Sequence, residues 1–222
     1  MEKNNHNIVL IWDWNGTLVN DAFIFVSLVN GYLSSYNLKN ISIVEYKNTF
    51  CFPVSDYYQR LGFSLSNKEF QALSADFIKN YEKVMFSASL VPGIKELLLD
   101  FSVFGYKQFL LSAQERSLLL RSVNYYGLNS FFVSVLGLKN NYADSKKALA
   151  RALVKKHCSH KDILVVIGDT LHDFEVAQDL RAHCCLVSYG HNSLEKLTKT
   201  GAFVAENIQD IKQFIHQVSL GC

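Results

Sequence analysis

The stretch LIWDWNGTLVND, residues 10–21, decides how the rest of the chain is interpreted. The apolar run NIVLIWD (7–13) ends on the carboxylate of Asp13, and Asn15, Gly16 and Thr17 follow at once. A short continuous apolar run is typical of a strand that is covered on both faces of a sheet. Because glycine and asparagine favour tight turns, the stretch predicts a buried strand whose carboxyl end presents an acid on a turn.

Four further apolar runs alternate with helical patterns along the second half of the chain. The runs are YKQFLLSA (106–113), FFVSVLG (131–137), DILVVIGD (162–169) and HCCLVSYG (183–190), and helices are expected over 114–126, 145–157, 172–182 and 193–199. Strands that alternate with helices are joined by right-handed crossovers into a parallel sheet. The sequence therefore predicts an α/β fold with a doubly wound, Rossmann-like parallel sheet.

The first two predicted strands are separated by residues 14–105, which is too long a segment for one crossover. Helical patterns over 20–36, 42–47, 53–61 and 67–86 predict an inserted helical cap. We expect residues 1–18 and 89–222 to form the core domain and residues 19–88 to form the cap domain. The aromatic-rich segment 49–63 is interpreted as packing between cap helices. The alternative is a pocket lining in which Arg60 meets a substrate carboxylate.

The composition excludes several classes of protein. The chain has 222 residues, 49% hydrophobic and 19% charged, and its net charge of +2 comes from basic residues spread along its length, so no nucleic-acid partner is expected. The N-terminus lacks the pattern of a secretory signal, and no apolar run approaches the ~20 residues that span a bilayer. Five cysteines without a CxxC pattern indicate reduced thiols and a cytoplasmic protein. A monomer and a homodimer both remain open.

Polar side chains stand where the predicted strands end. Asp13 follows the first strand, Ser112 ends the second, Lys146 opens the helix after the third, and GDTLHD after the fourth supplies Asp169 and Asp173. In open α/β sheets, ligands bind beyond the carboxyl ends of the strands. Each residue alone has an ordinary alternative role, as a helix cap for the serine and the acids or as a solvated lysine. Together they predict one site on one rim.

The chemistry that unites these side chains is that of phosphate. Clustered carboxylates repel one another and require a counter-charge, and Mg²⁺ binds through carboxylates, substrate phosphate and water. The lysine, the serine and the N–H groups of the turn at Gly16 suit phosphoryl oxygens. We expect Asp13 to attack phosphorus and form an aspartyl-phosphate that water then hydrolyses. The expected partner is a small phosphorylated metabolite.

These motifs resemble, in order and spacing, the signature of the haloacid dehalogenase superfamily of phosphatases. They read DWNGT (13–17), LLSA (110–113), Lys146 in DSKKAL (144–149) and GDTLHD (168–173). VPGIKELL (91–98) is similar to the point where the chain returns from an inserted cap to the core. The resemblance covers essentially the whole chain, and phosphoglycolate-phosphatase-like members with a helical C1-type cap are the most similar group.

The resemblance implies a role for each matching residue. The implied catalytic set is Asp13, as nucleophile, with Asn15, Ser112 and Lys146. The implied metal ligands for Mg²⁺ are Asp13, the backbone carbonyl of Asn15, Asp169 and Asp173. The implied phosphate-binding and substrate-binding set, in which Thr17 also supports the turn, is Gly16, Thr17, Ser112, Ala113 and Lys146.

Asn15 departs from the family's pattern, which usually places an aspartate there to protonate the leaving group and then activate water. An amide cannot exchange a proton near neutral pH, and losing general acid–base assistance costs about 10²–10⁴ in rate. Three outcomes are open. In the first, the substrates have good leaving groups, such as acyl or aryl phosphates. In the second, another group takes the place of the missing acid, with His172 as a candidate unless it is simply solvated. In the third, phosphate esters bind without efficient turnover. A large gain from Asn15→Asp would show that the missing acid limits the enzyme.

Two other functions compete with a Mg²⁺-dependent phosphatase. A haloacid dehalogenase, which forms an ester on Asp13, would tolerate Asn15 because halide leaves without a proton. Carboxylates at 169 and 173 count against it, because they suit a cation that dehalogenation does not need. A non-catalytic phosphate-ester-binding protein, whose cap moves when ligand binds, is supported mainly by Asn15.

Overall fold

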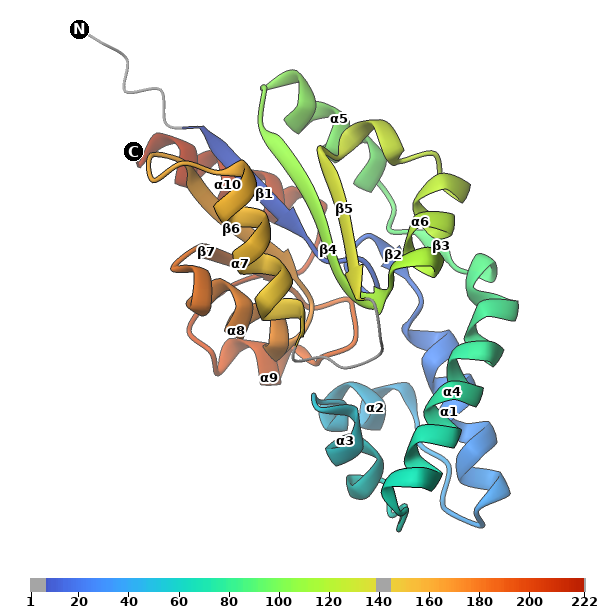
Figure 1. The fold of residues 1–222 in the computed structure, drawn as a ribbon. Coiled ribbons are helices and arrows are strands. Elements are labelled where there is room, and N and C mark those ends of the chain that lie inside the picture. Colours follow the sequence, from blue (N-terminus) through green and yellow to red (C-terminus); the bar gives the residue numbers. More distant parts are fainter. Residues whose placement is uncertain (1–6, 139–144, 222) are drawn as a thin grey trace, which may run out of the picture.

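The computed structural model describes residues 7–138 and 145–221. Its centre is a six-stranded parallel sheet with the strand order β5-β4-β1-β6-β7-β8 (Figure 1). The strands are β1 (Ile8–Trp12), β4 (Lys107–Glu115), β5 (Ser134–Leu138), β6 (Ile163–Gly168), β7 (His183–Val187) and β8 (Phe203–Ala205). The first strand is central and the chain winds outward from it in both directions, so the predicted doubly wound sheet is confirmed.

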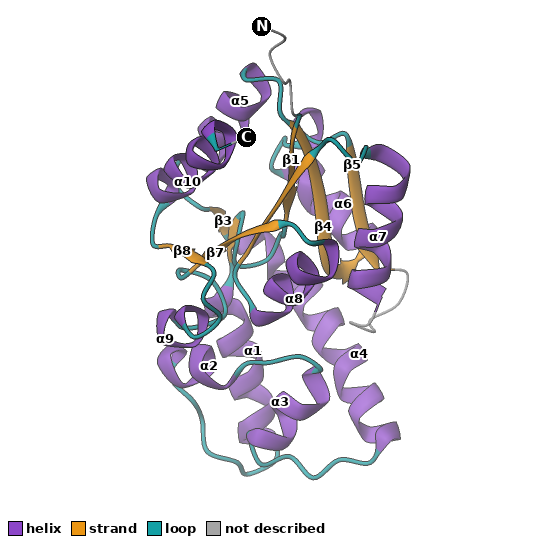
Figure 2. Ribbon diagram, turned by 90° about the vertical axis from the view of Figure 1, so that its left-hand side faces the viewer, coloured by secondary structure: helices purple, strands orange, loops and turns teal. Residues whose placement is uncertain are grey.

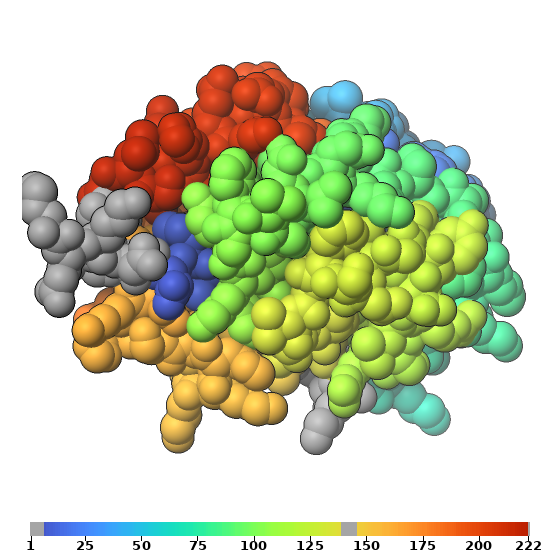
Figure 3. Space-filling model, turned by 90° about the horizontal axis from the view of Figure 1, so that it is seen from above, coloured from blue at the N-terminus to red at the C-terminus, as the bar shows by residue number. Residues whose placement is uncertain are grey.

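Helices cover both faces of the sheet (Figure 2). Side chains of α5 (Ile94–Val103), α6 (Arg116–Tyr125) and α10 (Ile208–Leu220) join one hydrophobic cluster, and those of α7 (Ser145–His157) and α8 (Leu171–Leu180) join the other. Alternate side chains of β1 enter the two clusters, because successive residues of a strand point to opposite faces. This explains why β1 is apolar at every position. Figure 3, seen from the end opposite the cap, shows the start of the strand enclosed by later segments.

The inserted cap follows directly after the turn that ends β1. The short strands β2 (Val19–Asn20) and β3 (Ser89–Leu90) pair antiparallel where the chain leaves the core and returns to it. Between them lie α1 (Ala22–Ser35), α2 (Ile43–Thr49), α3 (Val54–Arg60), α4 (Asn67–Val84) and the 3₁₀ turn η1 (Met85–Ser87), below the sheet in Figure 1. The proposed division into 1–18 with 89–222 and 19–88 stays a prediction.

The aromatic segment of the cap packs the cap helices together. Phe50, Tyr57, Tyr58 and Phe63 are buried in a separate hydrophobic cluster with residues of α1 and α4. The interpretation of this segment as packing is therefore confirmed for these four side chains. Arg60 lies exposed at the end of α3, and its contact with a substrate carboxylate stays a prediction.

Several elements differ from expectation. β8 and α10 were not expected from the sequence. Among the described helices, none is both long and apolar enough to cross a membrane. β4 continues through Ser112 to Glu115, so the alternative role of Ser112 as a helix cap is wrong. Glu115 caps α6 instead, because its carboxylate accepts hydrogen bonds from the N–H groups of Ser117 and Leu118 at 3.0 and 3.1 Å.

Candidate active site

The turn after β1 is held by its own backbone and by the neighbouring strand. The N–H of Asp13 donates to the carbonyl of Ile167 in β6 at 2.8 Å, and Leu18 donates back to Trp14 at 2.9 Å. Gly16 has a φ of 71°, in the left-handed region. A Cβ at this position would lie 2.2 Å from Oδ2 of Asp169. Both the backbone conformation and the close approach therefore require glycine.

Three buried carboxylates converge beside this turn. Oxygen atoms of Asp13, Asp169 and Asp173 all lie within 4.8 Å of one another. Lys146, in the first turn of α7, donates to Oδ1 of Asp13 and to Oδ1 of Asp173, both at 2.6 Å. Asp169 accepts from the hydroxyl of Thr17 at 3.2 Å. Residues from four separate elements thus form one cluster, as the positions of the strand ends predicted.

Asp173 also has a structural role in its helix. Its Oδ2 accepts from the N–H and the hydroxyl of Thr170 at 3.0 and 2.7 Å, at the start of α8. The alternative interpretation of this acid as a helix-end residue is therefore correct, but it does not exclude a role in the cluster. The two oxygens of Asp173 therefore have different partners: Oδ2 contacts Thr170 and Oδ1 contacts Lys146.

Burial raises the pKa values of two of the three carboxylates. Burial, opposed by Lys146 and reinforced by repulsion from the other two carboxylates, raises the pKa of Asp13 to about 8. Burial, opposed by the nearby His191, raises the pKa of Asp169 to about 6. The pKa of Asp173 is lowered, because Lys146 and the hydroxyl of Thr170 outweigh its burial. One lysine therefore does not balance three carboxylates.

The donor set fits a hard divalent cation. All three acidic side chains offer oxygen atoms, which Mg²⁺ prefers, and no histidine or thiolate is needed to complete the group. The backbone carbonyl of Asn15 belongs to the same turn as Asp13, which is consistent with the ligand role that the family resemblance implies. The residues present therefore fit the expected metal.

Ser112 lies beside the turn on the adjacent strand. Leu110 of β4 pairs with Trp12 of β1, so Ser112, two residues further along, stands level with the turn. Its side chain is buried and its hydroxyl accepts from the N–H of Gln114 at 3.1 Å. Ala113 is half-buried, where the register between β4 and β5 shifts between Leu111 and Glu115. Asp144, the first residue of the lysine motif, lies outside the described residues.

Asn15 is turned toward the cap. Its Nδ2 donates to Oδ2 of Asp21 at 2.6 Å and to the hydroxyl of Tyr81 at 2.8 Å. Asp21 precedes α1 and is fully buried, and it also accepts from the N–H of Gly16 at 3.0 Å. Nε2 of His191 lies 3.2 Å from Oδ1 of the same carboxylate. Neither Asp21 nor His191 was predicted from the sequence as part of the site, although His191 follows the carboxyl end of β7.

His172 is buried, so the alternative of a solvated histidine is wrong. Only 8% of the residue is exposed, and its ring lies 5.1 Å from that of Phe52 in the cap. Nδ1 lies 3.5 Å from a carboxylate oxygen of Glu175, whereas Nε2 has no hydrogen-bond partner among the residues described. Burial and the nearby Lys146 lower the pKa of His172, which favours the neutral imidazole.

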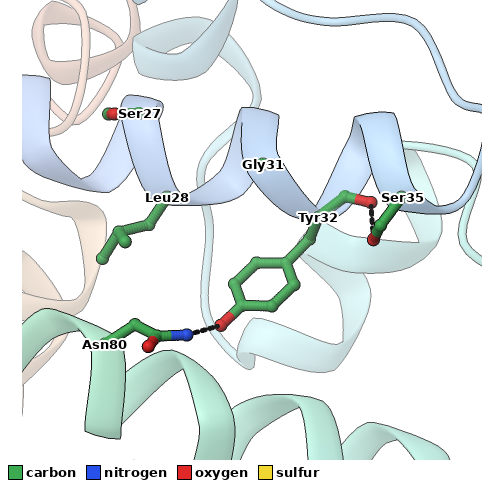
Figure 4. A pocket seen from close by; sticks show the side chains of 6 residues that line it. All are labelled: Ser27, Leu28, Gly31, Tyr32, Ser35 and Asn80. Carbon is green, nitrogen blue, oxygen red and sulfur yellow. Dashed lines mark hydrogen bonds between the residues drawn. The ribbon is translucent and has the colours of Figure 1, made fainter.

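A separate groove lies in the cap, between α1 and α4. The groove has a volume of about 300 Å³. The side-chain amide of Asn80 donates a hydrogen bond to the hydroxyl of Tyr32 at 2.9 Å, as Figure 4 shows. Its lining residues are Ser27, Leu28, Gly31, Tyr32, Ser35 and Asn80. None of the strand-end residues lines this groove, so it does not belong to the carboxylate cluster.

The doubly wound sheet, the helical insertion after the first strand and the acidic strand-end cluster define a class of capped α/β hydrolases. A family model described as haloacid dehalogenase-like hydrolase matches residues 10–187. The chain belongs to this family. None of the curated proteins compared with it matches the chain.

Solved structures share the fold over nearly the whole chain. A haloacid dehalogenase-like hydrolase from Streptococcus pneumoniae has 18% identity and a TM-score of 0.77, covering 95% of this chain and 98% of that one. A predicted phosphoglycolate phosphatase from Haemophilus somnus has 19% identity and a TM-score of 0.72, covering 93% and 97%. Protein Tyrosine Kinase A from Mycobacterium tuberculosis has 20% identity and a TM-score of 0.76, covering 94% and 98%. At these identities the likeness concerns the fold alone.

Proposed function

We propose that the chain is a Mg²⁺-dependent phosphatase that acts on a small phosphorylated metabolite through an aspartyl-phosphate on Asp13. The observation that carries this proposal is the convergence of Asp13, Asp169 and Asp173, two of which contact Lys146, beside a turn with a left-handed glycine. Asp13, Asp169, Asp173 and the carbonyl of Asn15 would hold the ion. When bound, Mg²⁺ neutralises the carboxylates and polarises phosphoryl oxygens.

The chain's own side chains supply the remaining chemistry. A carboxylate oxygen of Asp13 forms a bond to phosphorus while the bond from phosphorus to the leaving oxygen breaks. Ser112, Lys146 and the N–H of Ala113 bind the phosphoryl oxygens, whereas the N–H of Gly16 already donates to Asp21 and to the carbonyl of Val19. Water then attacks phosphorus, the bond to Asp13 breaks, and orthophosphate leaves. The buried surroundings of Asp13 strengthen each of these electrostatic contacts.

Protonation of the leaving group is the step for which the chain lacks the usual acid. Both hydrogens on Nδ2 of Asn15 are engaged by Asp21 and Tyr81. His172 is the candidate substitute. As a neutral imidazole whose Nε2 has no hydrogen-bond partner in the described part of the chain, it suits the activation of water better than the donation of a proton. We therefore favour substrates whose leaving group departs without a proton, such as acyl or aryl phosphates.

The test is a phosphatase panel of acetyl phosphate, an aryl phosphate and alkyl phosphates, with release of orthophosphate as the measurement. We expect turnover of the first two that is abolished by EDTA and by Asp13→Asn. The matched control is Asp56→Asn, an exposed acid of the cap. Activity that persists with EDTA or in the Asp13 variant would refute the mechanism. Saturable binding of phosphate esters with no turnover would favour the non-catalytic alternative, and halide release from a haloacid would favour the dehalogenase.

We propose a cytoplasmic location as well, with neither a nucleic acid nor a membrane as partner, because the composition favours neither. A monomer and a homodimer are equally compatible with the proposed reaction, since every residue assigned to the site comes from one chain.

A further inference from the structure

The buried carboxylate of Asp21, which has no assigned role in the reaction, contacts four polar groups around the turn after β1. Oδ1 accepts from the N–H of Gly16 at 3.0 Å and lies 3.2 Å from Nε2 of His191. Oδ2 accepts from Asn15 at 2.6 Å and from the hydroxyl of Tyr81 at 2.8 Å. Within the described part of the chain, no lysine or arginine contacts this carboxylate. Its charge is therefore held by four polar groups from three separate parts of the fold.

These four groups join the nucleophile turn to the cap. Gly16 and Asn15 belong to the turn that carries Asp13, whereas Tyr81 lies in α4 of the cap. His191 extends the connection, because its Nδ1 lies 2.7 Å from the hydroxyl of Tyr46 in α2. The backbone N–H of His191 also donates to Asp169 at 2.5 Å. One carboxylate at the start of α1 therefore contacts the turn, the loop beside Asp169 and, directly or through His191, two cap helices.

The identity of Asn15 follows from this arrangement. Position 15 faces a carboxylate at 2.6 Å and a tyrosine hydroxyl at 2.8 Å, and that hydroxyl in turn donates to the same carboxylate. A side chain with two N–H hydrogens satisfies both acceptors, while a second carboxylate would offer Asp21 no hydrogen. In this arrangement the carboxylate of Asp21 requires a hydrogen-bond donor at position 15, and the amide of Asn15 supplies it.

We propose that Asp21 is a positioning residue that sets the geometry of the nucleophile turn and the seating of the cap together, with Asn15 as its required partner. This inference deepens the proposed function, since it assigns Asn15 to positioning and leaves the leaving group without an acid from that residue. It predicts that Asn15→Asp does not give the large gain in turnover that would show a missing acid to be limiting. The substitution places two buried carboxylates against each other, so the turn that carries Asp13 is displaced.

The test compares Asn15→Asp, Asp21→Asn and the double exchange N15D/D21N, with Asn20→Asp as the control. Asn20 is exposed and adjacent to Asp21, so its variant adds the same charge without entering the network. Trp12 and Trp14, the chain's only tryptophans, flank Asp13 and are 0% and 1% exposed, so intrinsic fluorescence reports on the turn. The readouts are acrylamide quenching, the midpoint of thermal unfolding and the turnover of acetyl phosphate.

Each single variant is expected to increase quenching and to lower the midpoint by roughly 4–10 °C. A displaced nucleophile lowers kcat by about 10²-fold with little change in KM. The double exchange restores one donor amide opposite one carboxylate, so most of each loss is recovered. Tyr81→Phe removes one hydrogen bond to Asn15 and one to Asp21 without changing the charge. We expect this variant to fold and to show a smaller increase in quenching than Asn15→Asp or Asp21→Asn.

Additive losses in the double exchange would overturn the proposal, as would an Asn15→Asp variant with raised turnover and unchanged quenching. Quenching and thermal unfolding do not depend on catalysis. A wild-type chain without phosphatase activity would therefore refute the proposed function, while the recovery in the double exchange would still decide the role of Asp21.

Discussion

Lys146→Met tests whether a single ammonium group stabilises the carboxylate cluster. Lys146 is 4% exposed and contacts Asp13 and Asp173 at 2.6 Å each. Methionine keeps much of the length of the side chain and removes its charge. Removing one partner from a buried ion pair costs about 3–5 kcal/mol, because the remaining charge stays uncompensated. For a chain of this length we expect the midpoint of thermal unfolding to fall by roughly 6–20 °C in EDTA.

The adjacent residue provides the matched control. Lys147 forms an ion pair with Glu175 at 2.7 Å, but the two side chains are 35% and 50% exposed. Exposed pairs contribute about 0–1 kcal/mol, so Lys147→Met is expected to shift the midpoint by no more than about 4 °C. The same substitution at neighbouring positions of one helix separates the effect of the buried charge from that of helix propensity.

Magnesium makes the prediction sharper. A divalent cation bound by Asp13 and Asp173 supplies the positive charge that the Lys146→Met variant lacks. We therefore expect added Mg²⁺ to stabilise this variant more than the wild type, as measured by circular dichroism during thermal unfolding. Two results would refute the reasoning: a loss below about 1 kcal/mol in EDTA, or a loss that Mg²⁺ leaves unchanged. Either would mean that the lysine and the cation do not serve the same carboxylates.

The remaining predictions concern pH and the nucleophile turn. Because the pKa of Asp13 is raised to about 8 and that of Asp169 to about 6, the folded state binds more protons than the unfolded state between pH 4 and pH 8. The unfolding free energy of the metal-free protein should therefore fall as pH rises through this window. Over the same window the affinity for Mg²⁺, measured by calorimetry, should rise. The opposite trend in either quantity would contradict the raised pKa values of Asp13 and Asp169. Gly16→Ala should abolish turnover and lower stability well beyond Gly127→Ala. Both glycines have a positive φ, but only at Gly16 would a Cβ lie 2.2 Å from a carboxylate oxygen of Asp169. Equal losses of stability in the two variants would exclude this close approach as the cause.

The features that sequence predicted correctly depend on local pattern and on one geometric rule. The strands are short apolar runs because both faces of the sheet are covered, and that pattern is visible without a structure. Parallel strands bring their carboxyl ends to one rim. Residues as distant in the chain as Asp13 and Asp173 could therefore be placed together before any contact was known, and they share Lys146.

Other elements were missed for identifiable physical reasons. β8 has three residues, fewer than an apolar run needs to be recognised. α10 was missed although Ile208, Ile211 and Ile215 have helical spacing, which is a signal that the sequence does contain. The ring of His172 lies against Phe52, and one of the four partners of Asp21 is Tyr81. Both partners belong to the cap, and their positions follow from how the cap is seated on the core, which no local pattern specifies.

The charges in the cluster explain why a divalent cation suits this chain better than a second lysine. Three buried carboxylates face one ammonium group, which leaves two negative charges when all are ionised. The raised pKa values of Asp13 and Asp169 are the response of the metal-free protein, since holding a proton is less costly than a buried unpaired charge. A second lysine would neutralise only one of these charges, and it would do so permanently. Two charges carried by one exchangeable ion would neutralise the cluster, and Asp21 stays outside this balance because four polar groups already hold it.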